Sequence, residues 1–221
     1  GSEMCIRDSV GTGKNVTSVN LALANGSGSA SNYSINSLTA EITGKPVTIS
    51  GSRLYDSTTT ASSSILTITS GVSGESLSLT GSGVLGAASA GTQTITNNNT
   101  LAIADGSGGL ASNYTLSGAT INVTIIPRTL NVTLSREYDG TTAVSGALLT
   151  PTFDSLQGGE TLALSGTGSV STANVGSSKA VSLGSIALAA GSGNPSNYTL
   201  NSATMNTVSY THLTLPTKDG G

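Results

Sequence analysis

Short runs of alternating apolar and polar residues follow one another along most of the chain. One run contains Val47 and Ile49, and another contains Ile121, Val123 and Ile125. Similar runs lie at 77–79, 130–134, 162–164, 181–183 and 186–188. A period of two places the apolar residues on one face of a half-buried strand. Gly-Ser, Asn-Gly and Gly-Gly clusters separate the runs, and no segment has the apolar stripe of a helix. The pattern therefore predicts an all-β protein.

The sequence also repeats itself with a period of about 82 residues. GESLSLTGSG at 74–83 returns as GETLALSGTG at 159–168. The tripeptide Ser-Asn-Tyr recurs behind Gly- and Ser-rich segments at 31–33, 112–114 and 196–198. Repetition at a fixed period indicates one structural unit used several times in a row. The period divides the chain into the C-terminal part of a truncated repeat (10–44), a complete repeat (45–127) and a nearly complete repeat (128–207).

Each repeat contains six to eight short predicted strands separated by turns, a spacing typical of an antiparallel sandwich or barrel. We therefore expect tandem antiparallel β-sandwich domains of the immunoglobulin-like kind. A parallel β-helix would show a rung repeat of about 20–25 residues. The much longer period observed in this sequence favours discrete domains.

Both ends of the chain fall outside the register of the repeat. Residues 1–9 and 208–221 resemble translated sequencing-adapter segments that recur at the ends of assembled metagenomic fragments. We expect both tails to be disordered and foreign to the fold, so they are set aside before the fold is considered. Cys5 and His212 lie in these tails, and the repeats contain neither residue type.

Composition excludes several function classes. The chain has 8 Lys and Arg, 11 Asp and Glu and a formal net charge of −3, which leaves no basic patch for nucleic acid or anionic lipid. No apolar run approaches the about 20 residues of a transmembrane helix. Without His and Cys the repeats lack the usual base for a Ser nucleophile, a disulfide framework and a Cys-ligated zinc site. We expect no enzymatic activity, no cofactor and no bound metal, no nucleic-acid partner and no membrane insertion.

Three carboxylates raise the question of calcium binding. Asp105, Asp154 and Glu160 lie in or near Gly-rich segments, but the spacing of an EF-hand or of a Gly-rich nonapeptide calcium repeat is absent. We interpret them as turn carboxylates. Glu75 and Glu160 occupy equivalent repeat positions, which is what a structural role predicts.

The recurring tyrosines are the structural landmarks of the repeat. Tyr55-Asp56 and Tyr138-Asp139-Gly140 each follow an alternating run, and Asp followed by Gly is turn chemistry. We expect each of these Tyr side chains to cap the core at a strand end, with its hydroxyl group bonded at the edge. The second repeat has Ser57 where the third has Gly140, so the glycine is not obligatory within this chain. The alternative to this structural interpretation of the Tyr-Asp positions is a ligand-binding role.

The other landmarks are the Asn-Tyr pairs that follow a loop and begin a strand, namely Asn32, Tyr33, Asn113, Tyr114, Asn197 and Tyr198. A buried Tyr whose hydroxyl group reaches back to the backbone of a loop would resemble the corner motif of sandwich domains. The alternative is a ladder of exposed Tyr rings on which glycans stack.

Several motifs of the third repeat resemble the YDG-type repeat of bacterial surface proteins. They are YDGTTA at 138–143, GGETLALSGTG at 158–168, Asn-Val-Gly with a following Lys at 174–179 and Gly-Ser-Gly before Asn-Tyr-Thr-Leu at 191–200. The resemblance covers about 10–207, and the second repeat departs from it at 55–57 and 88–91. Such repeats occur in large exported adhesins similar to filamentous haemagglutinin. The resemblance implies a cell-surface or secreted location and supplies no catalytic residues.

We therefore expect structural stalk or spacer repeats of a large exported bacterial adhesin, which present a binding region away from the cell surface. The alternative is that the repeats themselves bind a glycan or a host matrix protein. The expected partners are neighbouring repeats of the same chain and, under the alternative, that glycan or matrix protein. The expected location is extracellular, on the bacterial cell surface.

Tyr114→Phe tests the structural interpretation of the Asn-Tyr pairs. Removing a bonded hydroxyl group from a buried site costs about 0.5–1.5 kcal/mol, so we expect a lower melting temperature for the repeat that carries Tyr114. Thermal unfolding followed by circular dichroism measures it. Unchanged melting would count against a bonded hydroxyl.

Overall fold

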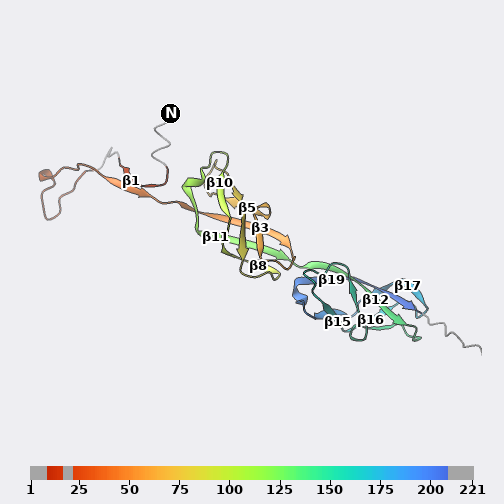
Figure 1. Ribbon diagram of the computed structural model, residues 1–221. Helices are drawn as coiled ribbons and strands as arrows, with labels where there is room; N and C mark the ends of the chain where they lie inside the picture. The colour runs from red at the N-terminus through yellow and green to blue at the C-terminus, as the bar shows by residue number, and fades with distance from the viewer. Residues whose placement is uncertain (1–8, 17–21, 209–221) are drawn as a thin grey trace, which may run out of the picture. The chain divides into compact units, whose positions relative to one another are not determined.

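The computed structural model describes residues 9–16 and 22–208, which are drawn in colour in Figure 1. These residues form β-strands and short 3-10 turns, with no α-helix among them. The predicted all-β class is therefore confirmed. The predicted foreign tails, 1–9 and 208–221, lie outside the described residues except for Ser9 and Val208, and so do Cys5 and His212.

The described residues form two compact units. Unit 1 comprises the residues up to Gly51 together with Thr60–Leu85 and Thr94–Val123. Unit 2 comprises Ser52–Thr59, Gly86–Gln93 and the residues from Thr124 onward. Three short segments of the repeat predicted at 45–127 thus belong to the compact unit that contains the following repeat, namely 52–59, 86–93 and 124–127. The predicted repeat boundaries describe the sequence period and stay a prediction.

Unit 2 contains the complete set of strands of the last repeat. They are β12 (Arg128–Glu137), β13 (Ala143–Ser145), β14 (Thr152–Phe153), β15 (Leu162–Ser165), β16 (Thr167–Val170), β17 (Gly176–Ser182), β18 (Ala187–Ala190) and β19 (Tyr198–Val208). Six of them form one sheet in the order β13-β16-β17-β19-β12-β14, and β15 pairs with β18 in a second sheet. The chain therefore builds two sheets from one repeat.

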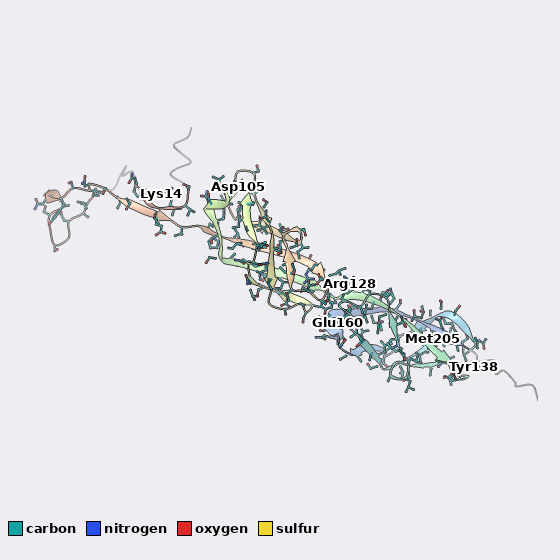
Figure 2. The ribbon with its side chains drawn as sticks, viewed as in Figure 1. Lys14, Asp105, Arg128, Tyr138, Glu160 and Met205 are labelled. Atoms are coloured by element: carbon teal, nitrogen blue, oxygen red, sulfur yellow. The ribbon has the colours of Figure 1, made fainter. Side chains whose placement is uncertain are left out.

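The core of unit 2 lies between these two sheets. Met205 of β19, labelled in Figure 2, and Leu134 of β12 are fully buried, and they belong to one apolar cluster with Leu164 of β15. The whole cluster is Val132, Leu134, Val144, Leu164, Val170, Val181, Ile186, Ala203 and Met205. β12 and β19 each contribute alternate residues to it, as the period of two predicts. This sandwich-like arrangement fits the predicted fold class.

One strand pair departs from the antiparallel arrangement that was predicted. β12 and β19, the first and last strands of the repeat, are parallel from Arg128 opposite Tyr198 to Glu137 opposite Val208. β12–β14, β13–β16, β16–β17, β17–β19 and β15–β18 are antiparallel. Alternation in a sequence has the same period in both kinds of sheet, so it does not reveal strand direction.

The preceding repeat has the same plan. Its strands are β3 (Lys45–Leu54), β4 (Thr60–Ser62), β5 (Leu66–Thr69), β6 (Leu77–Thr80), β7 (Ser82–Leu85), β8 (Gly91–Gln93), β9 (Ile95–Asn97), β10 (Ala102–Asp105) and β11 (Tyr114–Ile126). The sheets run in the orders β5-β3-β11-β8, β4-β7-β9 and β10-β6. Two short strands, β8 and β9, take the place of the single strand β17, so the large sheet is divided in two. The truncated repeat contributes the antiparallel pair β1 (Gly11–Asn15) and β2 (Thr39–Ile42).

Five 3-10 turns separate strands in the described part of the chain. They are η1 (Ala30–Asn32), η2 (Ser63–Ile65), η3 (Ala111–Asn113), η4 (Gly146–Leu148) and η5 (Pro195–Asn197). η1, η3 and η5 each end at the Asn of a Ser-Asn-Tyr tripeptide. The recurring tripeptide is therefore the turn that leads into the Tyr-containing strand.

Gly166 and Gly140 form a matched pair for testing this fold. Both have a left-handed backbone, with φ of 78° and 73°. A Cβ atom at position 166 would lie 2.0 Å from the carbonyl oxygen of Ser185, whereas one at position 140 would have no atom within 4 Å. We expect Gly140→Ala to cost about 1–2 kcal/mol, because an L-residue adopts this conformation at that cost. Gly166→Ala adds a backbone clash, so we expect a loss above about 4 kcal/mol. Urea unfolding of the two variants measures both values, and equal losses would contradict the described turn at Gly166.

Candidate functional site

Three side chains of unit 2 form a hydrogen-bonded group that we call the tyrosine–glutamate cluster: Tyr55, Glu160 and Tyr198. The Tyr55 hydroxyl donates to Oε1 of Glu160 at 2.6 Å, and the Tyr198 hydroxyl donates to Oε2 at 2.6 Å. The two rings meet edge to face, with centroids 5.3 Å apart. Tyr55 is 3% exposed and Tyr198 is 5% exposed. Both carboxylate oxygens of Glu160, whose position is labelled in Figure 2, are thus bonded to phenols whose rings are buried.

Local structure brings these side chains together from three parts of unit 2. Tyr198 is the first residue of β19, directly after η5, and its hydroxyl also accepts the Gln157 backbone N–H at 3.0 Å. Glu160 lies in the turn before β15, where its own N–H donates to the carbonyl of Gln157 at 3.0 Å. Tyr198 thus bonds both the backbone and the carboxylate of the same turn. This resembles the corner arrangement predicted for the Asn-Tyr pairs.

Both backbone polar groups of Tyr55, its N–H and its carbonyl, form hydrogen bonds. Its N–H donates to the carbonyl of Ile126 at 2.9 Å, and its carbonyl accepts from Nε of Arg128 at 2.9 Å. Ile126 and Arg128 flank the proline that joins β11 to β12. The segment Ser52–Thr59 is therefore attached to the start of the last repeat through backbone bonds as well as through the cluster.

Burial and the neighbouring carboxylate keep both phenols protonated. Burial first, and then the hydrogen bond to Glu160, raise the pKa of Tyr55 to about 12. The same two causes, in the same order, raise the pKa of Tyr198. A neutral phenol is the donor that a carboxylate needs, and such charge-assisted bonds are among the stronger ones in proteins. The cluster is consequently suited to hold parts of the chain together, because both oxygens of its carboxylate are already bonded.

The preceding repeat contains the same glutamate–tyrosine pair in unit 1. The hydroxyl of Tyr114, the first residue of β11, donates to the carboxylate of Glu75. This bond first, and then burial, raise the pKa of Tyr114. In the part of the chain that the structure describes, no second tyrosine contacts Glu75 in the way that Tyr55 contacts Glu160.

The asparagines of the Asn-Tyr pairs form a second recurring contact. In unit 2 the buried Asn197 accepts the backbone N–H of Ala90 at 2.8 Å. In unit 1 Asn113 accepts the backbone N–H of Val10 at 3.2 Å. Val10 and Ala90 each precede a glycine at the same position of the repeat. The side chain of Asn in one repeat thus bonds the backbone of the repeat before it.

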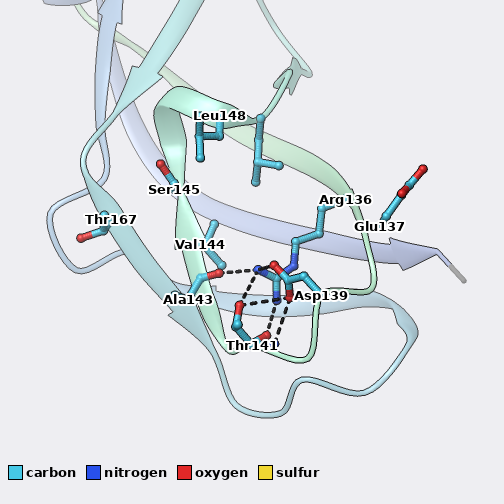
Figure 3. A pocket seen from close by; sticks show the side chains of 10 residues that line it. Arg136, Glu137, Asp139, Thr141, Ala143, Val144, Ser145, Leu148 and Thr167 are labelled. Carbon is cyan, nitrogen blue, oxygen red and sulfur yellow. Dashed lines mark hydrogen bonds and ion pairs between the residues drawn. The ribbon is translucent and has the colours of Figure 1, made fainter.

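The loops that contain Tyr-Asp are built in the same way in both repeats. Oδ1 of Asp139 accepts the N–H of Thr141 at 2.9 Å and its hydroxyl at 3.0 Å (Figure 3). Oδ1 of Asp56 accepts the N–H of Thr58 at 2.9 Å and its hydroxyl at 2.8 Å. Ser57 has a φ of 63°, close to the 73° of Gly140. The two loops therefore share one conformation, and Ser57 adopts it in spite of its side chain.

An arginine lies three residues before each aspartate. Arg136 pairs with Asp139, where Nη1 and Oδ2 are 3.1 Å apart, and Arg53 pairs with Asp56. The N–H of Thr141 first, and further bonds and the charge of Arg136, lower the pKa of Asp139. Burial raises the pKa of Asp56, but the bonds from Thr58 and Arg53 outweigh burial and lower it. Each loop is thus internally bonded around an ionised aspartate.

The predicted landmark tyrosines differ in how much of the side chain is exposed to solvent. Tyr55, Tyr114 and Tyr198 are buried, whereas Tyr33 and Tyr138 are largely exposed. Asn113 and Asn197 make the backbone contacts described above, and Asn32 ends η1. The rings of Tyr114 and Tyr198 are not free to stack on a glycan.

Sequence reasoning did not find the glutamates as partners of the tyrosines. The sequence pattern shows Glu75 and Glu160 only as equivalent repeat positions, and it predicts a turn carboxylate at Glu160. Their recurrence 39 residues before Tyr114 and 38 residues before Tyr198 is the signal that points to the pairing. Among the described residues, no group of three or more His, Cys, Asp or Glu side chains is placed to hold a metal ion.

Comparison with known proteins identifies one family. The sequence model of the YDG domain matches residues 39–123 and 124–215. No curated protein and no solved structure matches the chain significantly. The two matched segments follow each other without a gap and together span most of the chain.

The tyrosine–glutamate cluster predicts a loss of stability at alkaline pH. Tyr55 has a pKa of about 12 in the folded state and 10.0 as its ordinary value. Its contribution is therefore fully present below pH 10 and is lost as the pH rises toward 12. We expect the melting temperature of the chain to fall over this range, and Tyr55→Phe to fall less steeply. Calorimetry between pH 8 and 12 measures both, and equal slopes for the two proteins would contradict the assignment.

Proposed function

Because the chain belongs to the YDG domain family and contains two copies of the domain in tandem, we propose that it is a spacer. In this proposal the repeats form part of the stalk of a large exported bacterial adhesin and present a binding region away from the cell surface. Their contribution is length and stiffness, without a reaction or a ligand of their own.

The parallel pairing of the first and last strands is the observation that supports this role best. β12 and β19 run side by side in the same direction over ten residue pairs. The chain therefore begins the repeat at one end of the sheet and finishes it at the other. At about 3.3 Å per residue, these strands advance the chain by about 33 Å within one repeat. A repeat with antiparallel first and last strands would return the chain to its starting end.

The bonding of the recurring residues also favours a structural role. The tyrosines of the cluster and Asn197 bond groups of the protein itself, and their positions are buried. The surface positions between apolar residues are mainly Ser and Thr, which offer few charged groups for recognising a ligand. No helix in the described part of the chain is long and apolar enough to cross a membrane.

Recovery of the native locus tests the exported-adhesin proposal. Sequencing outward from residues 10 and 207 is expected to show further repeats, an export signal and a surface anchor or translocator. A short open reading frame that encodes both tails as they stand and contains none of these features would overturn the proposal.

A binding panel tests the spacer role itself. The purified 221-residue chain is applied to immobilised glycans and to host matrix proteins. We expect no saturable binding, because three of the five recurring tyrosines, Tyr55, Tyr114 and Tyr198, are buried. Saturable binding that is lost in a Tyr33→Ala or Tyr138→Ala variant would support the alternative, in which the repeats are themselves adhesive. Wild-type binding that survives both substitutions would also contradict a pure spacer.

A further inference from the structure

Tyr55 and Tyr138 occupy the same position of the repeat but have different surroundings. Tyr55 follows β3 and is 3% exposed, because its ring and hydroxyl lie in the tyrosine–glutamate cluster. Tyr138 follows β12 and is 53% exposed. A large exposed aromatic side chain at a position that is buried in the other repeat indicates a surface that lacks its partner.

The loop that follows Tyr138 has the same conformation as the loop that follows Tyr55, whose tyrosine is buried in the tyrosine–glutamate cluster. Asp139 makes the same two bonds to Thr141 that Asp56 makes to Thr58, and the backbone of Gly140 is left-handed like that of Ser57. The ion pair with the preceding arginine is also present. Because these bonds form without a partner on Tyr138, docking would not have to pay for ordering the loop.

A second residue of the same surface shows the same contrast. Val175 precedes Gly176 as Ala90 precedes Gly91, and Ala90 is bonded through its backbone to Asn197. Val175 is 51% exposed, whereas Ala90 is half-buried. Tyr55 and Ala90 of the preceding repeat are thus bonded to groups of the last repeat, whereas the equivalent residues of the last repeat, Tyr138 and Val175, are exposed.

Sheet register places these two positions at one end of unit 2. Glu137, next to Tyr138, is opposite Val208 of β19, and Gly176, next to Val175, is opposite Thr207. Tyr138 and Val175 therefore flank the end of β19 on its two sides. Tyr55 and Ala90 flank the end of β11 in the same way, since β11 lies between β3 and β8 in its sheet.

A cavity of about 320 Å³ lies beside this loop (Figure 3). Arg136, Asp139 and Thr141 line its polar side, and Val144, Leu148 and Leu149 line its apolar side. Leu148 is itself largely exposed. The loop that carries Tyr138 thus borders a cavity that is partly apolar.

We propose that Tyr138 and Val175 form a docking surface for a further YDG repeat, whose Glu-Tyr pair binds the Tyr138 hydroxyl and whose Asn side chain binds the Val175 N–H. The partner is defined by the contacts within unit 2, where Glu160 accepts the Tyr55 hydroxyl, Asn197 accepts the Ala90 N–H and the Tyr198 ring meets the Tyr55 ring edge to face. A carboxylate with one phenol already bonded to it, as in Glu75–Tyr114, has an oxygen left for this contact. This docking surface rests on the proposed function in one respect, because both require several repeats in one chain.

An extended chain tests the docking surface. Thr207 is followed in it by a second copy of residues 124–207, which continues the register of the repeat, and the copy carries Phe in place of its own Tyr138. In the 221-residue chain, we expect Tyr138→Phe to leave the melting temperature unchanged. In the extended chain, the same substitution is expected to lower it by about 2–4 °C, matching the shift caused by Tyr55→Phe. A neutral Tyr138→Phe in the extended chain would overturn the proposal.

Chemical modification provides a measurement that does not depend on stability. Tetranitromethane is expected to nitrate Tyr138 in the 221-residue chain, to spare Tyr55 in both chains, and to spare Tyr138 in the extended chain. Glu160→Ala together with Tyr198→Phe in the added copy is expected to restore the reaction of Tyr138. Equal nitration of Tyr138 in the two unsubstituted chains would contradict the docking surface.

A second extension guards against an added copy that does not fold. Residues 41–123 then follow Thr207, so Glu75, Tyr114 and Asn113 present the same groups from a different sequence. The docking proposal requires protection of Tyr138 in whichever extended chain shows the calorimetric transition of an additional repeat. These outcomes are separate from the proposed function, because locus recovery and the binding panel do not depend on the contact of Tyr138.

Discussion

The hydrogen bonds to the Glu160 carboxylate are the interaction on which unit 2 depends most. A carboxylate that loses water is costly unless its oxygens are bonded, and here each oxygen accepts a phenol hydroxyl at 2.6 Å. Tyr198 connects the turn before β15 to the start of β19, which links the two-stranded sheet to the six-stranded one. Tyr55 connects the same turn to the segment Ser52–Thr59. One side chain thus joins both sheets and a segment of the preceding repeat.

This arrangement compensates for a core built with few large side chains. The chain has no Trp and one Phe, and aromatic residues make up 3% of it. Small repeats of this kind bury little apolar surface and gain from contact with their neighbours. Unit 2 includes Ser52–Thr59 and Gly86–Gln93 for this reason: Tyr55 and Ala90 are bonded to groups of the last repeat. Stability is shared across the sequence boundary, so the compact units do not coincide with the sequence period.

Much of the fold could be predicted from the sequence, because alternation is a local property. The buried faces of β12 and β3 are the alternating residues that the pattern selects, for example Leu130, Val132 and Leu134. The parallel direction of β19 could not be predicted, since direction depends on where the chain travels between strands. The pairing of Glu160 with Tyr198 crosses 38 residues. Only the joint recurrence of the two positions in each repeat pointed to it.

The contrast between Tyr55 and Tyr138 marks the limit of reasoning from local sequence. The two loops have the same Asp-Thr bonds and nearly the same backbone, so local sequence determines the loop. Burial of the tyrosine is decided by what lies beyond the loop, which is a Glu-Tyr pair in one case and solvent in the other. A repeat therefore carries a preformed binding element whose burial is not encoded in the repeat itself. Burial at this position is then a property of the junction between repeats, and it depends on residues contributed from both sides.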